Sequence, residues 1–216
     1  RYRASGQAIL VFAQRLESVE QVAKALAKEK LAVQVLTGTM RGLERDALVR
    51  NDPVFQRFRP HNPESEEEPR PCPPSAQPNP GLAVRSQTPA PAASNRDTPP
   101  TDAPSSATVY LICTAAGEVG VDISADHLVC DLAPFESMAQ RLGRVNRYGE
   151  GAADVDVVAA PVSGAEPSPY DEARRRTREL FEHLPVEDGG GHDASPGALG
   201  ALPAADRLAA FSPPPY

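Results

Sequence analysis

The chain has 216 residues, a net charge of −7, 24 prolines and only three cysteines, with no C-x-x-C pair. This cysteine usage argues against a disulfide framework and a zinc site, and the acidic balance does not by itself suggest a nucleic-acid binder. No apolar stretch reaches the ~18 residues of a membrane span, and no signal peptide is visible, so we expect a cytoplasmic protein without a membrane partner. The first residue is Arg1 and not Met, which leaves a fragment and a stand-alone protein both open.

The prolines divide the chain into ordered and disordered parts. Fourteen of the 24 lie between Pro53 and Pro104. Large apolar residues are almost absent from Pro60 to Ser106, so burial could not offset the entropy of ordering that stretch. We therefore predict the first half of a domain at 1–51, a Pro-rich disordered insertion at 52–107, the second half of the domain at 108–160, a C-terminal helix at 161–185 and a disordered tail at 186–216.

Apolar runs and helical periodicities alternate along the chain. The continuous run Ala8–Ala13 predicts a strand that is covered on both faces. Apolar residues at three- and four-residue spacing predict a helix from Glu17 to about Glu29. The same reasoning assigns, in chain order, a strand at 32–36, a helix at 42–49, strands at 108–113 and 127–132, a helix at 135–145, a strand at 153–159 and a helix at 169–184. This alternation favours an α/β fold with a parallel sheet and helices on both faces.

Polar residues follow four of the predicted strands. Gln14 and Arg15 follow the first strand, Thr37 and Gly38 the second, and the segment Thr114–Asp122 the third. A helix that carries arginines follows the fourth strand. Because ligands of open α/β sheets bind beyond the carboxyl ends of the strands, we expect the four loops to present functional groups at one edge.

The run Gln140–Gly149 holds the arginines of that fourth loop. Gln140 and Arg144 are four residues apart and share a face of the predicted helix, and Arg147 follows about one turn later. A guanidinium is always charged and suits bidentate capture of phosphate oxygens. These arginines are therefore candidates for gripping the terminal phosphate of a nucleotide. The alternative is a solvated basic helix end that the macrodipole favours.

Two further loops are candidate phosphate or sugar contacts, and each has a structural alternative. The glycines of Thr114–Asp122 allow close backbone approach to a phosphate, and Asp122 can accept bonds from ribose hydroxyls. An ordinary strand-to-helix turn explains the same spacing. Thr37–Arg41 resembles a loop that holds a nucleic-acid phosphate, whereas Thr39 as a helix N-cap is equally compatible with the pattern.

Other hydrolytic machinery is absent from the sequence. The four histidines are dispersed, and the pair His192-Asp193 lies in a Gly-rich segment without another histidine nearby. The sequence contains no G-x-x-x-x-G-K-[ST] phosphate loop and no D-E-x-H strand end, so it lacks the usual cradle for β- and γ-phosphates and Mg²⁺. Arginines without that loop suggest one half of a composite site, with arginine fingers acting across a cleft.

The order of these motifs resembles the second RecA-like domain, or helicase C-terminal domain, of superfamily 2 helicases. The resemblance covers Ala8 to about Ala160 and implies a single RecA-like domain. Phe12–Arg15 resembles the fourth motif of the family, and Leu36–Thr39 the segment that touches the nucleic-acid backbone. Thr114–Asp122 is similar to the fifth motif, and Gln140–Arg147 to the sixth, Q-R-x-G-R-x-x-R.

The resemblance implies roles for individual residues. Gln140 would position the attacking water or the γ-phosphate, and Arg144 and Arg147 would be arginine fingers. The cofactor would be ATP with Mg²⁺, whose metal ligands are expected on a first RecA-like domain that this sequence lacks. Nucleotide contacts would come from Gly117, Glu118, Asp122 and Arg141, and nucleic-acid contacts from Gln14, Arg15, Thr37, Gly38, Arg41 and Thr114.

Three segments make the chain most similar to the helicase of CRISPR-associated type I helicase–nucleases: Gly120–Ser124, Asp131–Pro134 and Asn146–Gly149. Members of that family use ATP to reel in and unwind a DNA strand, which a separate domain cuts. The resemblance implies the C-terminal half of an ATP-dependent DNA helicase in antiviral defence. Its partners would be DNA, a first RecA-like domain and a CRISPR surveillance complex, and we expect the isolated chain to be inactive. The alternatives are a non-hydrolysing nucleic-acid-binding remnant and another superfamily 2 DNA-repair or RNA helicase.

Overall fold

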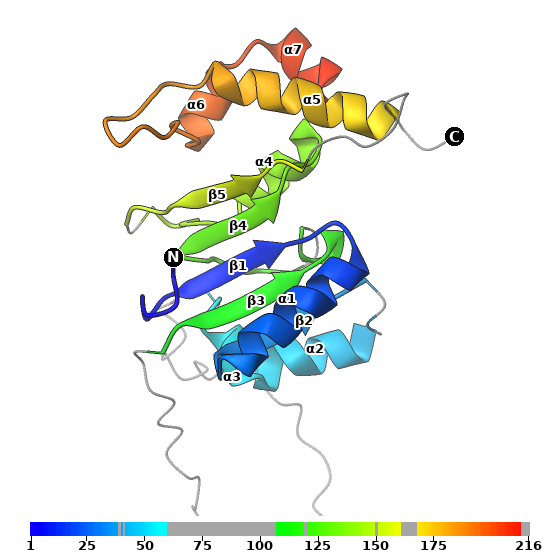
Figure 1. Ribbon diagram of the computed structural model, residues 1–216, viewed down its shortest axis with the longest axis vertical. Coiled ribbons are helices and arrows are strands. Elements are labelled where there is room, and N and C mark those ends of the chain that lie inside the picture. Colours follow the sequence, from blue (N-terminus) through cyan, green and yellow to red (C-terminus); the bar gives the residue numbers. More distant parts are fainter. Residues whose placement is uncertain are drawn as a thin grey trace, which may run out of the picture. The chain divides into compact units, whose positions relative to one another are not determined.

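The computed structural model describes residues 1–38, 40, 42–59, 107–118, 121–149, 151–160 and 168–212. Five strands in this part of the chain form one parallel sheet in the order β2-β3-β1-β4-β5 (Figure 1). They are β1 (Ala8–Phe12), β2 (Ala32–Leu36), β3 (Val109–Cys113), β4 (His127–Asp131) and β5 (Val155–Val158). The predicted α/β class and parallel sheet are therefore confirmed.

The central strands carry apolar side chains on both faces, as their continuous apolar runs predict. In β1, Leu10 and Phe12 contribute to one core cluster and Ile9 and Val11 to the other, because successive side chains of a strand point to opposite faces. A strand of this kind needs cover on both sides. The cover on one face comes from α1 (Leu16–Lys28), whose Val19 is fully buried.

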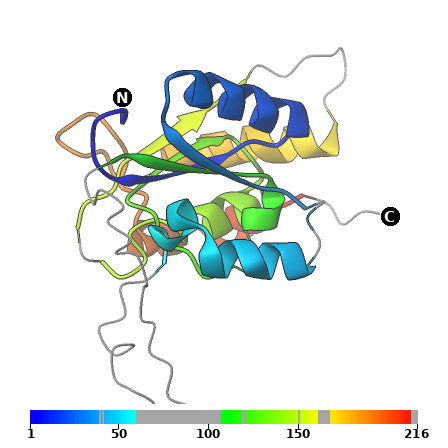
Figure 2. The same cartoon turned by 90° about the horizontal axis from the view of Figure 1, so that it is seen from below.

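The opposite face of the sheet is covered by helices from two distant parts of the sequence (Figure 2). They are α2 (Gly42–Asn51), α3 (Pro53–Gln56) and α4 (Phe135–Leu142). Met138 of α4 is fully buried in the same cluster as the strand residues of this face. The helix that carries the predicted nucleotide-contacting residues is thus anchored on the sheet through its apolar side.

The predicted insertion begins too early in the sequence, and the structure corrects its first boundary. Asp52 caps α3 by accepting a hydrogen bond from the Phe55 backbone N–H at 2.9 Å. Phe55 and Phe58 are fully buried in the core, and Arg57 donates to the Gly6 carbonyl at 2.8 Å. These two phenylalanines are large apolar side chains of a kind that is scarce in the rest of the Pro-rich sequence, and their burial explains why this part is ordered. Residues 60–106 lie outside the described residues.

The structure also corrects the start of the predicted disordered tail. The expected C-terminal helix is present as α5 (Pro169–Glu182), and two short helices follow it, α6 (Pro196–Ala201) and α7 (Ala204–Ala209). Leu199 and Leu202 pack with side chains of α4 and α5 in a third apolar cluster, so ordered packing continues beyond 185. The Gly and Pro content is misleading here, because a proline suits the first turn of a helix.

Two thiols lie in the sheet, and both are free and buried: Cys113 and Cys130. Burial raises the pKa of both thiols, that of Cys130 to about 12. Cys72 lies outside the described residues. No helix in the described ranges combines the length and the apolar character that a membrane crossing requires.

Candidate nucleotide and nucleic-acid site

The loops after β1, β2 and β3 meet at the carboxyl edge of the sheet, as predicted. Gln14 and Arg15 are exposed directly after β1. The Thr114 backbone N–H donates to the Leu36 carbonyl at 3.2 Å, which joins the loop after β3 to the end of β2. A Cβ at Gly38 would lie 3.9 Å from the Ala116 Cβ, so the Thr37–Gly38 loop is a neighbour of the turn after β3. Arg41 lies outside the described residues.

Gly117 sits where the turn after β3 passes closest to the core. A Cβ at this position would lie 2.7 Å from the Cys113 Cβ, 2.8 Å from its Sγ and 3.0 Å from Cε1 of Phe12. Such distances are shorter than side-chain packing tolerates. A glycine is therefore required at this position by packing, whatever the turn binds.

The helix α4 ends earlier than the sequence predicts, and this changes the geometry of the arginine run. It stops at Leu142, with Gly143 as its C-cap. Beyond it the backbone pairs with Ala125, whose N–H donates to the Arg144 carbonyl at 2.8 Å. The predicted helix to Val145 is therefore wrong at its end, because this pairing replaces the last helical turn. Gln140 is exposed on α4 and does not share a helix face with Arg144.

The segments of the fifth and sixth motifs run side by side. The Arg144 guanidinium donates to the Glu118 carbonyl at 2.8 Å. Arg147 forms an ion pair with Asp122, and its backbone N–H donates to the Ser124 hydroxyl at 3.2 Å. The chain continues from Ser124 toward the amino end of β1, where the Asp126 backbone N–H donates to the Ala8 carbonyl at 2.9 Å. Arg147 thus lies toward the amino ends of the strands and not at the carboxyl edge, which corrects the expectation of one shared edge.

Arg141 is buried among protein groups. Its side chain is 3% exposed, and its Nε donates to Glu118 at 2.8 Å. Its Nη1 donates to the Asp131 carboxylate at 2.7 Å and to the carbonyl of the same residue at 2.9 Å, and the guanidinium lies 5.0 Å from the Phe12 ring centroid. Burial alone would lower the pKa of Arg141, but these hydrogen bonds outweigh it and raise the pKa.

The remaining candidate residues keep groups that a ligand can reach. Arg144 is half-buried, and among the described residues its guanidinium donates to the Glu118 carbonyl alone, which leaves other N–H donors for a ligand. Arg147 and Asp122 are 42% and 65% exposed. These cationic donors suit a phosphate. Nucleotide contacts by Gly117, Glu118, Asp122 and Arg141 stay predictions.

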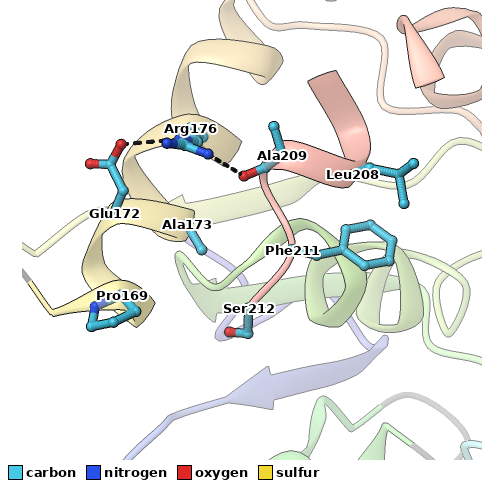
Figure 3. Close-up of a pocket in the computed structure, with 8 residues that line it drawn as sticks. All are labelled: Pro169, Glu172, Ala173, Arg176, Leu208, Ala209, Phe211 and Ser212. Atoms are coloured by element: carbon cyan, nitrogen blue, oxygen red, sulfur yellow. Dashed lines mark hydrogen bonds and ion pairs between the residues drawn. The ribbon is translucent and has the colours of Figure 1, made fainter. Parts of the chain in front are cut away.

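A hollow of about 500 Å³ lies between α5 and α7 (Figure 3). On its wall, Arg176 donates to Glu172 at 3.0 Å and to the Ala209 carbonyl at 2.9 Å. Arg175 also pairs with Glu172. Arg175 and Arg176 are thus paired with a carboxylate of their own helix, and none of the predicted site residues lines this hollow.

Sequence reasoning missed three side chains that hold the site together. Asp131 binds both Arg141 and the Gln14 backbone N–H, the latter at 2.7 Å. Phe12 lies under the Arg141 guanidinium, and Ser124 anchors the backbone after the sixth motif. A carboxylate at the end of a buried strand was a usable signal for Asp131, because strand ends point to the ligand edge.

Known proteins share this fold. Residues 5–150, more than half of the chain, match the family described as CRISPR-associated nuclease/helicase Cas3, C-terminal. The crystal structure of T. fusca Cas3 matches with a TM-score of 0.57 and 13% sequence identity over 95% of this chain and 20% of that one. A crystal structure of a CRISPR-associated protein matches with a TM-score of 0.54 and 16% identity over 98% of this chain and 20% of that one. No curated protein matches.

The chain spans about a fifth of the length of these solved structures. At such low identity they establish the fold, and the family match establishes the relationship. The chain belongs to the family of the C-terminal part of the CRISPR-associated nuclease/helicase Cas3 and is a RecA-like helicase C-terminal half.

Proposed function

We propose that the chain is the C-terminal half of an ATP-dependent DNA helicase or translocase. In this proposal, Arg144 and Arg147 are arginine fingers that reach the ATP phosphates across a cleft, and Gln140 positions the attacking water or the γ-phosphate. The other wall of the cleft belongs to a first RecA-like domain. The observation that carries the proposal is the position of both arginines beside the fifth-motif segment, through Glu118 and Asp122.

The ion pair between Arg147 and Asp122 is compatible with a role of Arg147 as an arginine finger. Both partners are largely exposed, and an exposed pair of this kind contributes about 0–1 kcal/mol. A phosphate offers the guanidinium shorter, charge-assisted and bidentate hydrogen bonds, so it can replace Asp122 at little cost. Asp122 is then free to accept a ribose hydroxyl, the role proposed for it.

The carboxyl edge is the proposed path of the nucleic acid. Gln14, Arg15 and Gly38 are exposed there, and the half-buried Thr37 and Thr114 complete the edge. Exposed N–H groups, hydroxyls and a guanidinium are the groups that bind a phosphate backbone without reading bases. Because Arg147 lies away from this edge, we propose that it can contact ATP while DNA is bound at the edge. We propose that Arg41 also contacts the nucleic acid along this path.

ATP with Mg²⁺ is the proposed cofactor. Bound ATP supplies a phosphoanhydride bond to be hydrolysed, and this chain would supply cations that stabilise charge on the transferred phosphoryl group. T. fusca Cas3–ATP, which has this fold with a TM-score of 0.56, supports ATP as the nucleotide. In the described ranges, no group of three or more His, Cys, Asp or Glu side chains is arranged to hold a metal ion. The Mg²⁺ ligands are proposed for the first domain.

We propose DNA as the nucleic acid and CRISPR type I interference as the setting. The match to a family described as a CRISPR-associated nuclease/helicase supports a helicase that acts in a CRISPR system. A CRISPR surveillance complex is the proposed protein partner, and the cytoplasm the proposed compartment. Antiviral defence follows from this setting as the proposed biological role.

The proposal is tested by joining the chain to a first RecA-like domain of a Cas3 and measuring ATP hydrolysis with single-stranded DNA, with RNA and without nucleic acid. We expect hydrolysis that DNA stimulates more than RNA, and none from the chain alone. Stimulation by RNA alone would indicate an RNA helicase. Salt-sensitive DNA binding without hydrolysis in the joined protein would indicate the non-hydrolysing remnant and refute the proposal.

A further inference from the structure

We propose that Arg141 acts as a positioning residue and not as a nucleotide ligand. Together with Glu118 and Asp131 it forms a buried ion cluster that fixes the carbonyl to which Arg144 is bonded. The proposal rests on the proposed function only where it concerns ATP hydrolysis, because the position of Arg144 can be measured without it.

The ion cluster joins the ends of neighbouring strands. Asp131 ends β4, and its carboxylate binds Arg141 at 2.7 Å and the Gln14 backbone N–H after β1 at 2.7 Å. Glu118 follows β3, and Phe12 ends β1 under the guanidinium. One side chain from α4 thus connects the loops of three adjacent strands, β3, β1 and β4.

Glu118 transmits the effect to Arg144. Its carboxylate accepts from Arg141 at 2.8 Å, and its carbonyl accepts from Arg144 at 2.8 Å. The side chains of Arg141 and Glu118 are only 3% and 7% exposed. Without Arg141, the Glu118 carboxylate would be a buried charge that lacks this partner, and it would have to turn toward water. That movement displaces the peptide whose carbonyl holds Arg144.

Arg147 does not depend on the ion cluster. It is held by Asp122 and by Ser124, and the backbone before it is fixed by the pairing of Val145 with Ala125. Loss of the ion cluster should therefore release Arg144 and leave Arg147 in place. The two proposed fingers provide an internal comparison within one protein.

The test is modification of the chain with phenylglyoxal, an arginine-specific reagent, followed by mass spectrometry of the Arg144 and Arg147 peptides. In the Arg141→Met variant, we expect the rate at Arg144 to rise about fivefold, which corresponds to the loss of one ordinary hydrogen bond, while the rate at Arg147 does not change. Arg178→Gln is the matched control, because Arg178 is 65% exposed in a surface pair. It should change neither rate.

A second variant separates positioning from folding. Arg141→Met combined with Glu118→Met removes both ends of the buried pair, and apolar replacement of such pairs is often neutral for stability. We expect this double variant to melt near the wild-type temperature and still to expose Arg144, because it also lacks the side-chain bond to Arg141 that fixes the peptide of residue 118. Wild-type protection of Arg144 in the double variant, or in a folded Arg141→Met variant, would overturn the proposal.

Hydrolysis by the joined protein gives a further readout. Displacement of Arg144 should lower kcat about 100-fold in the double variant and leave DNA binding unchanged. If the wild-type joined protein hydrolyses no ATP, the proposed function fails, but the modification rates still decide the role of Arg141. If hydrolysis persists in the wild type and Arg144 stays protected in both variants, the positioning role alone is refuted.

Discussion

Substitution of Gly117 by alanine should destabilise the protein, although replacement of glycine usually stabilises an ordered turn. The added Cβ would lie 2.7 Å from the Cys113 Cβ and 3.0 Å from Cε1 of Phe12. The first of these atoms is fixed to β3, and the second belongs to a ring that is 2% exposed. Neither can withdraw without disturbing the core, so the turn that leads to Glu118 must shift.

Two opposing effects set the size of this change. Overpacking of a core costs about 1–3 kcal/mol. Replacement of a glycine also lowers the conformational entropy of the unfolded chain, which stabilises the folded state by about 0.4–1 kcal/mol. We expect a net loss of roughly 1–2 kcal/mol for Gly117→Ala, which lowers Tm by about 2–8 °C in a domain of this size.

Urea and thermal unfolding measure the effect, and Gly38→Ala is the matched control. Gly38 lies in the neighbouring loop, and its new Cβ would meet only the Ala116 Cβ at an ordinary 3.9 Å. This control should be unchanged or more stable by up to about 1 kcal/mol. The two substitutions should therefore differ in sign. Equal stabilisation by both would refute the close packing of the turn against β3 and β1.

Two further predictions concern the boundaries of the core and its thiols. Phe55→Ala should reduce the free energy of unfolding by about 3–5 kcal/mol, and Leu202→Ala by about 2–5 kcal/mol, as measured by urea unfolding. Losses below about 0.5 kcal/mol would mean that these side chains are not packed in the core. Stability should also fall as pH rises above about 8.5, because the unfolded chain then releases thiol protons that buried Cys113 and Cys130 retain. Urea unfolding at pH 8 and pH 10 checks this, and the fall should be smaller when both cysteines are alanine.

The layout of the sheet could be predicted from the sequence because its signals are local. Continuous apolar runs such as Ala8–Phe12 mark strands that are covered on both sides, and the spacing of Leu16, Val19 and Val22 marks α1. The loops of the ligand edge follow from the same boundaries, since parallel strands all end on one side. Gln14, Thr37 and Thr114 are therefore where the sequence places them.

The rest depends on contacts between distant segments. The end of α4 is set by the pairing of Val145 with Ala125, 20 positions earlier in the chain, and helical periodicity does not report such a pairing. The sequence motif indicates that Arg141 is one more phosphate ligand. Only the fold reveals that its guanidinium is already paired with the carboxylates of Glu118 and Asp131. The helices after 185 were missed for a related reason, because their few leucines are buried by α4 and α5.

The most direct test of the proposed composite ATP site is the kcat of the joined protein with single-stranded DNA after Arg147→Ala, compared with Arg178→Gln as a surface control. An arginine finger contributes about 10³–10⁵ to kcat, so Arg147→Ala should lower kcat at least about 10³-fold while DNA affinity is retained. Arg178→Gln should leave both unchanged. Equal hydrolysis by the wild type and Arg147→Ala would contradict the assignment of a finger to this chain.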